Sequence, residues 1–92
     1  MAKSLEEIRS EIDLLDKELA ELFEKRFHLV KEVIDYKIEN RLPILDEGRE
    51  KEIIEKNTNY IEDLDLQKYF RKVYSYMIET SRDYQEEILN DK

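Results

Sequence analysis

Two cations interrupt an apolar stripe near the start of the chain. Apolar side chains recur there at steps of three and four residues, but Arg26 and Lys37 stand where the pattern calls for two more. An Arg guanidinium grips a carboxylate through two parallel hydrogen bonds, and a Lys ammonium is a compact charge with three donors. On an otherwise apolar face, these residue types indicate the binding of an anion. The apolar members of the stripe are Leu5, Ile8, Ile12, Leu15, Leu19, Leu22, Leu29 and Val33.

Further polar residues stand on apolar faces later in the chain. Ser81 and Gln85 lie one turn apart on a stripe over residues 66–88, and Arg49 and Glu50 share a face with the apolar residues of a short segment. An unpaired buried cation costs several kcal/mol, so several cations in one place indicate that an anion compensates them. The set therefore predicts a pocket in a helical bundle for a small ligand with more than one negative charge.

Each of these residues also has a structural interpretation that the sequence leaves open. Arg26 fits a buried ion pair or the edge of a dimer interface, and a cation at Lys37 suits the C-terminal end of a helix dipole. The hydroxyl of Ser81 fits a hydrogen bond back to its own helix, with Gln85 at the margin of the stripe. The two charged residues of the short segment fit an exposed flank.

Three helices are expected to position these residues, because one Gly and one Pro leave little room for the turns of a β-rich fold. Ser4 and Asp46 are the expected N-caps of the first and second helices. The first helix is expected to end near Pro43, and the second at a loop over residues 57–59. The expected fold is all-α, with a long, a short and a long helix in one domain over residues 1–92. The expected helices cover about residues 4–40, 47–57 and 64–89.

The length of the first helix indicates a second copy of the chain. A helix of roughly 35 residues is about 52 Å long, whereas a compact chain of 92 residues has a diameter of roughly 32 Å. The chain alone cannot cover a stripe that stays apolar along nearly the whole helix. We therefore expect an intertwined homodimer, with most of the core shared between the two chains.

The composition argues against several classes of function. The net charge is −8, and an acidic surface repels both nucleic acid and anionic membrane surfaces. The chain has no Cys and a single His, so we expect neither thiol chemistry nor a metal site. The start of the chain is charged and no run reaches the length of a membrane span, which predicts a soluble, cytoplasmic protein.

Taken in order, these residues resemble the all-helical chorismate mutases, the AroQ class of the shikimate pathway. The matching pieces are IRSEIDLLDKEL, EKRFHLVKEV, DYK, LPILDEGREKEI and IETSRDYQ, which together span about residues 5–89. The resemblance implies a three-helix subunit and an interlocked dimer with two identical sites. It also implies an isomerase that converts chorismate to prephenate in Phe and Tyr biosynthesis and needs no cofactor.

The resemblance further implies roles at the two charged ends of the substrate. Arg26 would bind one carboxylate of chorismate and Arg9, donated by the partner subunit, would bind the other. Ser81 would assist at one carboxylate. Lys37 and Gln85 would donate hydrogen bonds to the ether oxygen of the breaking C–O bond.

At the ring, the resemblance implies that Glu50 and the backbone of Asp46 bind the hydroxyl, while Arg49 supports the carboxylate end and orders the Asp46 region. The chain departs from the family pattern at Arg82, directly after Ser81, where an apolar residue is expected. The residues expected to act in catalysis are Lys37, Gln85, Arg26 and Glu50.

Two alternatives remain open. An isochorismate-pyruvate lyase has the same fold, similar cations and the glutamine, although Asp46, Glu50 and Ser81 favour the mutase pattern. A non-catalytic helical dimerisation module could instead use its buried polar residues to fix the register of the two chains.

Overall fold

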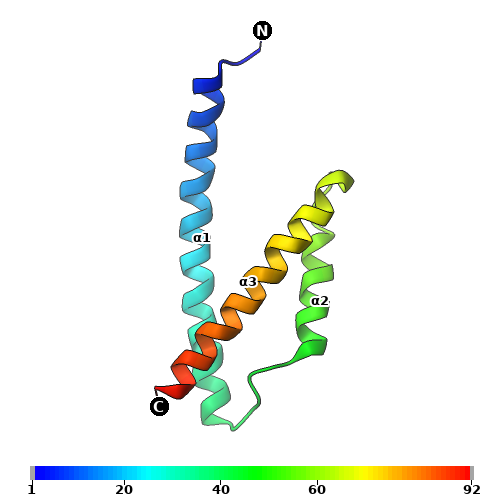
Figure 1. Ribbon diagram of the computed structural model, residues 1–92. Coiled ribbons are helices and arrows are strands. Elements are labelled where there is room, and N and C mark those ends of the chain that lie inside the picture. The colour runs from blue at the N-terminus through cyan, green and yellow to red at the C-terminus, as the bar shows by residue number, and fades with distance from the viewer. Residues whose placement is uncertain (1, 92) are drawn as a thin grey trace.

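The computed structural model describes residues 2–91, and within this range it contains three α-helices and no strand (Figure 1). α1 spans Leu5–Glu39, α2 spans Glu47–Thr58 and α3 spans Leu64–Asn90. Each helix end lies within one residue of the end predicted from the sequence. The expected all-α subunit with a long, a short and a long helix is confirmed.

The two predicted N-caps close the N-terminal ends of α1 and α2. Ser4 Oγ accepts a hydrogen bond from the N–H of Glu7 at 3.1 Å, and Asp46 Oδ1 accepts one from the N–H of Arg49 at 3.0 Å. Both bonds satisfy a backbone donor that has no partner within the helix. Because the first turn of α2 is fixed by Asp46, this cap also determines where Glu50 projects.

The C-terminal end of α1 is closed by backbone hydrogen bonds before the chain reaches Pro43. The N–H of Leu42 donates to the carbonyl of Lys37 at 2.8 Å, and that of Arg41 donates to Ile38 at 3.3 Å. This is the pattern of a Schellman motif. Arg41 takes a left-handed conformation with φ 56°, which usually favours Gly. Attributing the helix end to Pro43 overlooked this motif, because no Gly marks it in the sequence.

α2 ends at Thr58, one residue beyond its expected end at Asn57, so the prediction that Thr58 belongs to the following loop was wrong. Thr58 is fully buried, and its hydroxyl donates to the carbonyl of Ile54 at 2.6 Å. A buried threonine that bonds back to its own helix is compatible with the last helical turn. The connection to α3 begins at Asn59.

α3 packs against both other helices and holds the subunit together. Its C-terminal half crosses the C-terminal half of α1, and its N-terminal half lies beside α2 (Figure 1). Among the described residues, the buried apolar side chains are Val30, Ile34 and Ile78, and the Phe27 and Tyr84 rings pack nearby with their centroids 5.4 Å apart. The subunit is elongated, with extents of 59 × 25 × 15 Å and a radius of gyration of 16.8 Å. A compact chain of this length would have a radius of gyration near 12 Å.

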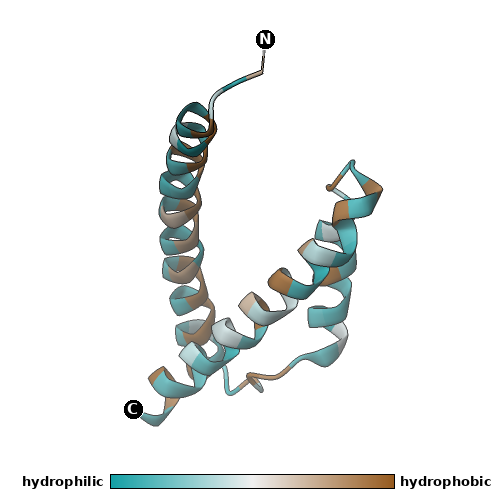
Figure 2. Ribbon diagram, turned by 45° about the horizontal axis from the view of Figure 1, so that its top comes forward, coloured by the Kyte–Doolittle hydropathy of each residue, from teal (hydrophilic) through white to brown (hydrophobic). Residues whose placement is uncertain are grey.

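The N-terminal half of α1 extends beyond the other helices and leaves its apolar stripe uncovered (Figure 1). The stripe residues from Leu5 to Leu22 are 42–64% exposed, and Figure 2 shows hydrophobic residues gathered along one side of this helix. Leu29 and Val33, further along the stripe, are also exposed. A homodimer would cover this open face, and it remains a prediction. Within residues 2–91, no helix combines the length and apolarity needed to cross a membrane.

Candidate functional site

Arg26 is held at the crossing of α1 and α3 by neutral groups. Its Nη1 donates to Ser81 Oγ at 2.7 Å, and its guanidinium carbon lies 5.8 Å from the centre of the Tyr74 ring. Ser81 in turn donates to the carbonyl of Met77 at 2.8 Å, so the expected hydrogen bond back to its own helix is present. The Tyr74 hydroxyl accepts from Asn57 Nδ2 at 2.8 Å. This chain of contacts fixes a half-buried guanidinium that has no ion pair with an acid in the described part of the chain.

Lys37 ties the end of α1 to the connection that leads into α2. Its half-buried Nζ donates to the carbonyl of Ile44 at 2.9 Å. The ammonium has three donors, so two N–H groups remain for another partner. Lys37 and Asp46 line a shared cavity of about 580 Å³, together with residues of the 42–47 segment. The structure therefore brings a cation and the cap of α2 to one hollow.

Glu50 lies in the first turn of α2 and reaches across to α3. Its carboxylate forms an ion pair with Arg82, whose Nη1 lies 2.9 Å from Oε1 and 3.2 Å from Oε2. Both side chains are largely covered, with 29% and 24% of their surfaces exposed. The sequence marked Arg82 only as a departure from a family pattern. Its contact with Glu50 depends on how α2 and α3 pack, which residue spacing along the chain does not reveal.

Gln85 is half-buried on α3 one turn after Ser81, and its amide oxygen is buried. Its Oε1 has no hydrogen-bond partner among residues 2–91. A buried amide oxygen without a partner is unusual, and rotation of the amide by 180° exchanges its oxygen and nitrogen. This group can therefore present either an acceptor or a donor to a ligand at that position.

The side chains of two predicted site residues lie apart from the others in the subunit. Arg49 is exposed on α2, and its Nη1 lies 3.8 Å from Glu52. Arg9 is exposed on the half of α1 that no other helix covers. The described chain thus groups Arg26 with Ser81 and Lys37 with Asp46, and it does not bring the side chain of Arg49 or of Arg9 to them.

The arrangement suits the recognition of a small organic anion. Arg26 and Lys37 both project from the C-terminal half of α1, each is half-buried, and each retains donors beyond the hydrogen bonds described. No group of three or more metal-ligating side chains that could hold a metal ion occurs between residues 2 and 91. The fold and the site therefore define an all-helical protein with cations on the inner faces of its helices.

The chain belongs to the chorismate mutase type II family, whose sequence model matches residues 8–86. This range contains every site residue that the sequence predicted, from Arg9 to Gln85. The membership confirms the resemblance recognised from the ordered motifs.

Two curated relatives are longer proteins that contain a matching segment. A bifunctional chorismate mutase/prephenate dehydratase from Buchnera aphidicola subsp. Schizaphis graminum (strain Sg) is 39% identical over 83 residues, which cover 89% of this chain and 22% of that protein. A T-protein from Haemophilus influenzae (strain ATCC 51907 / DSM 11121 / KW20 / Rd) is 48% identical over 48 residues, which cover 52% of this chain and 13% of that protein. The chain thus spans about a fifth or less of the length of these relatives. No solved structure matches it significantly.

Proposed function

We propose that the chain is a chorismate mutase, an isomerase that rearranges chorismate to prephenate in aromatic amino acid biosynthesis. The family membership supports this assignment. The single observation that carries it is the pair of half-buried cations on α1, Arg26 and Lys37, which are held by neutral groups and have no acid as an ion-pair partner among the described residues. A dianionic substrate supplies the charge that these cations lack.

The rearrangement is pericyclic, so it needs no nucleophile, metal or cofactor. The protein has to hold the enolpyruvyl side chain over the ring, and clamping both carboxylates restricts the substrate to that geometry. Arg26 binds one carboxylate with the donors that its bond to Ser81 leaves free. Ser81 assists by fixing the direction of the guanidinium.

Negative charge grows on the ether oxygen as the C–O bond lengthens. Lys37 and Gln85 donate hydrogen bonds to this oxygen, and fixed donors in a water-poor site stabilise such charge strongly. The bond from Lys37 to the Ile44 carbonyl holds the ammonium in place before the substrate arrives. Catalysis by this pair therefore depends on preorganisation of the end of α1 and of the 42–47 segment.

The ring hydroxyl is bound by Glu50 and by the backbone of Asp46 at the start of α2. A carboxylate offers about four lone-pair positions, so Glu50 can accept from Arg82 and from a ligand hydroxyl together. Arg49 orders the first turn of α2 and supports the carboxylate end of the substrate. In the isolated subunit it is exposed, so this role requires the complete assembly.

The functional unit is a homodimer, in which the partner subunit donates Arg9. The exposed apolar stripe and the position of Arg9 on the uncovered half of α1 support this arrangement. A cytoplasmic location fits such a biosynthetic enzyme and forms part of the same proposal.

Purified protein with chorismate tests the activity directly. Prephenate formation well above the uncatalysed rate is the expected result. Lys37→Ala should lower kcat by about 10²–10³-fold, the usual loss when one preorganised donor is removed. Lys31→Ala is the matched control, because Lys31 lies on the same helix and pairs at the surface with Asp35, 3.5 Å away. Lys31→Ala should leave kcat unchanged.

A parallel assay with isochorismate separates the alternatives. Pyruvate release from isochorismate without prephenate from chorismate would replace the mutase by a lyase. A stable helical dimer that acts on neither substrate would instead identify a dimerisation module.

Mixed dimers test the donation of Arg9 across the interface. Arg9→Ala and Lys37→Ala subunits should each be nearly inactive alone. After the two are mixed in equal amounts and re-equilibrated, about half of the dimers contain one subunit of each kind, and one of their two sites is intact. About one quarter of the wild-type activity should then return. No recovery in verified mixed dimers would place Arg9 in the site of its own subunit.

A further inference from the structure

We propose that Arg82 is a positioning residue that aims the Glu50 carboxylate at the ring hydroxyl of the substrate. The inference rests on the proposed mutase function and extends it to a residue at which the chain departs from the family pattern. Arg82 acts through Glu50 and does not touch the reacting atoms. Its contribution is therefore to recognition of the hydroxyl.

The geometry of the ion pair carries the proposal. One nitrogen of Arg82, Nη1, lies 2.9 Å from Oε1 and 3.2 Å from Oε2 of Glu50. Contact with both oxygens fixes the direction of the carboxylate group as well as its distance from α3. The remaining lone pairs of Glu50 stay available for a hydroxyl donor.

The position of Arg82 connects it to the rest of the site. It follows Ser81, which holds Arg26, and it precedes Gln85 by three residues, a spacing that places two side chains side by side on a helix. Glu50 lies one turn after Asp46, the cap of α2. The ion pair therefore joins the turn of α3 that carries Gln85 to the turn of α2 that carries the proposed hydroxyl acceptor.

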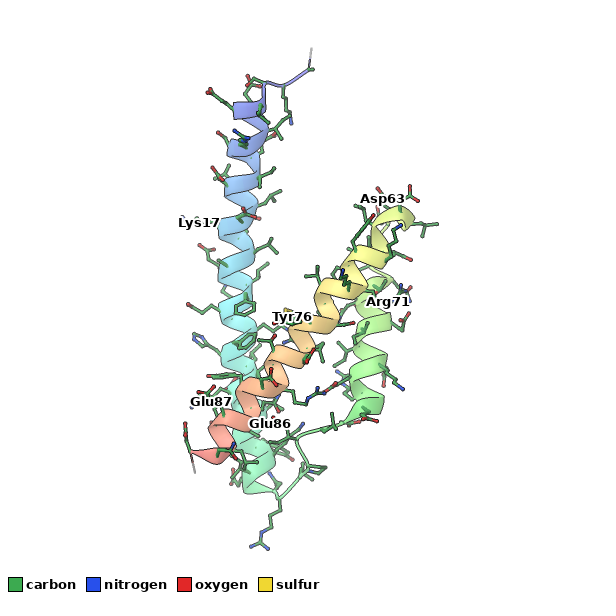
Figure 3. The ribbon with its side chains drawn as sticks, in the orientation of Figure 1. Lys17, Asp63, Arg71, Tyr76, Glu86 and Glu87 are labelled. Carbon is green, nitrogen blue, oxygen red and sulfur yellow. The ribbon has the colours of Figure 1, made fainter. Side chains whose placement is uncertain are left out.

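A second ion pair between α2 and α3 serves as a comparison, because it joins the same two helices and is more exposed. Arg71 Nε lies 3.0 Å from Glu55 Oε1, and these side chains are 43% and 61% exposed. Figure 3 shows Arg71 toward the N-terminal end of α3, where α2 lies beside it. The Arg82–Glu50 pair is more covered, so water screens it less, and it belongs to the end of α2 that adjoins the cavity with Lys37.

The test compares two substrates, chorismate and an analogue whose ring hydroxyl is replaced by hydrogen. Arg82→Met keeps much of the side-chain volume and removes the charge. A small misplacement of a binding group can cost up to about 10²-fold in rate, and we expect kcat/KM for chorismate to fall about 10- to 100-fold. The deoxy analogue has no hydroxyl to lose, so its kcat/KM should change less than about twofold.

Three further variants exclude a structural explanation. Glu50→Ala should lower kcat/KM for chorismate by a similar factor, and Arg82→Met in that background should cause no further loss. Arg82→Lys should restore part of the activity, because a single nitrogen makes both contacts with the carboxylate. Arg71→Met, which breaks the other pair between the same helices, should leave kcat/KM for both substrates unchanged. Circular dichroism establishes that each variant is helical.

Several outcomes would overturn the inference. Equal losses of kcat/KM on both substrates would show that Arg82 only holds α2 in place. A fully active Arg82→Met variant would show that the orientation of the Glu50 carboxylate does not depend on Arg82. Both outcomes concern the Arg82 variant alone. If the wild-type protein forms prephenate, the mutase assignment stands in either case. A wild-type protein that forms no prephenate removes the proposed function and this inference together.

Discussion

Leu19→Ala tests the proposed homodimer at the centre of the uncovered stripe. Leu19 is 64% exposed in the single subunit, and it lines a groove of about 960 Å³ between α1 and α3 with Leu22, Phe23 and Arg26. A dimer partner would bury the exposed part of this side chain. Truncation to alanine should therefore weaken the dimer and leave the fold of the subunit intact.

The size of the effect follows from the exposed fraction. Complete burial of a leucine side chain contributes about 1.5–3 kcal/mol. Multiplying this value by the 64% that is exposed gives about 1–2 kcal/mol for each subunit. A two-fold symmetric dimer contains the position twice, so association should lose about 2–4 kcal/mol. The dissociation constant should then rise about 30- to 1,000-fold.

Sedimentation equilibrium over a range of concentrations measures this constant. Leu14→Ala is the matched control, because Leu14 is exposed to nearly the same extent, 67%, and stands off the stripe. The two variants lose the same atoms from the same helix. They should therefore differ in association far more than in helix content.

Two results would refute the reasoning. A wild-type protein that sediments as a monomer at every concentration would remove the dimer. Equal weakening by Leu19→Ala and Leu14→Ala would retain a dimer but show that the stripe is not its interface.

Three other features give direct predictions. Tyr74→Leu removes the ring that lies 5.8 Å from the Arg26 guanidinium, and loss of a cation–π contact of about 0.5–1 kcal/mol should lower kcat/KM for chorismate about two- to fivefold. Tyr74→Phe keeps the ring and should retain the cation–π contribution to kcat/KM. Equal kcat/KM values for the two variants would contradict the prediction. Arg41→Gly relieves a left-handed backbone with φ 56° and should raise the free energy of unfolding by up to about 1 kcal/mol, measured as a higher urea midpoint; a lower midpoint would contradict it. Ile34→Ala truncates a side chain with 0% exposure and should lower the free energy of unfolding by about 2–5 kcal/mol in the same measurement. A loss below about 1 kcal/mol would show that the crossing of α1 and α3 is not the core.

The helices and their starts could be predicted because their signals are local. Ser4 and Asp46 each cap a helix through a backbone group three residues away, so the sequence contains both partners of the contact. The same holds for the bond from Ser81 to Met77, which lies one turn back on the same helix. The capping motif at the C-terminal end of α1 was harder to predict, because Arg41 occupies the left-handed position where Gly is usual.

Contacts between helices could not be predicted in the same way. Leu29 and Val33 continue the heptad-like stripe, yet Val30 and Ile34 are the buried residues where α1 crosses α3. Two apolar faces overlap on this helix, and periodicity alone cannot say which of them the same subunit covers. The partner of Glu50 was missed for a similar reason: it comes from α3, 32 residues along the chain.

Arg26 lies where these two faces of α1 meet, and this position links assembly to chemistry. It donates a hydrogen bond to Ser81 inside the subunit, and it also lines the groove that the exposed stripe leaves open. In the proposed dimer, the partner that covers the stripe also removes water from around this guanidinium. Coulomb attraction rises as the local dielectric constant falls, so the cation binds a carboxylate more strongly in the dimer than in a free subunit. In the proposed dimer, the apolar residues that precede Arg26 thereby contribute to binding of the proposed substrate without touching it.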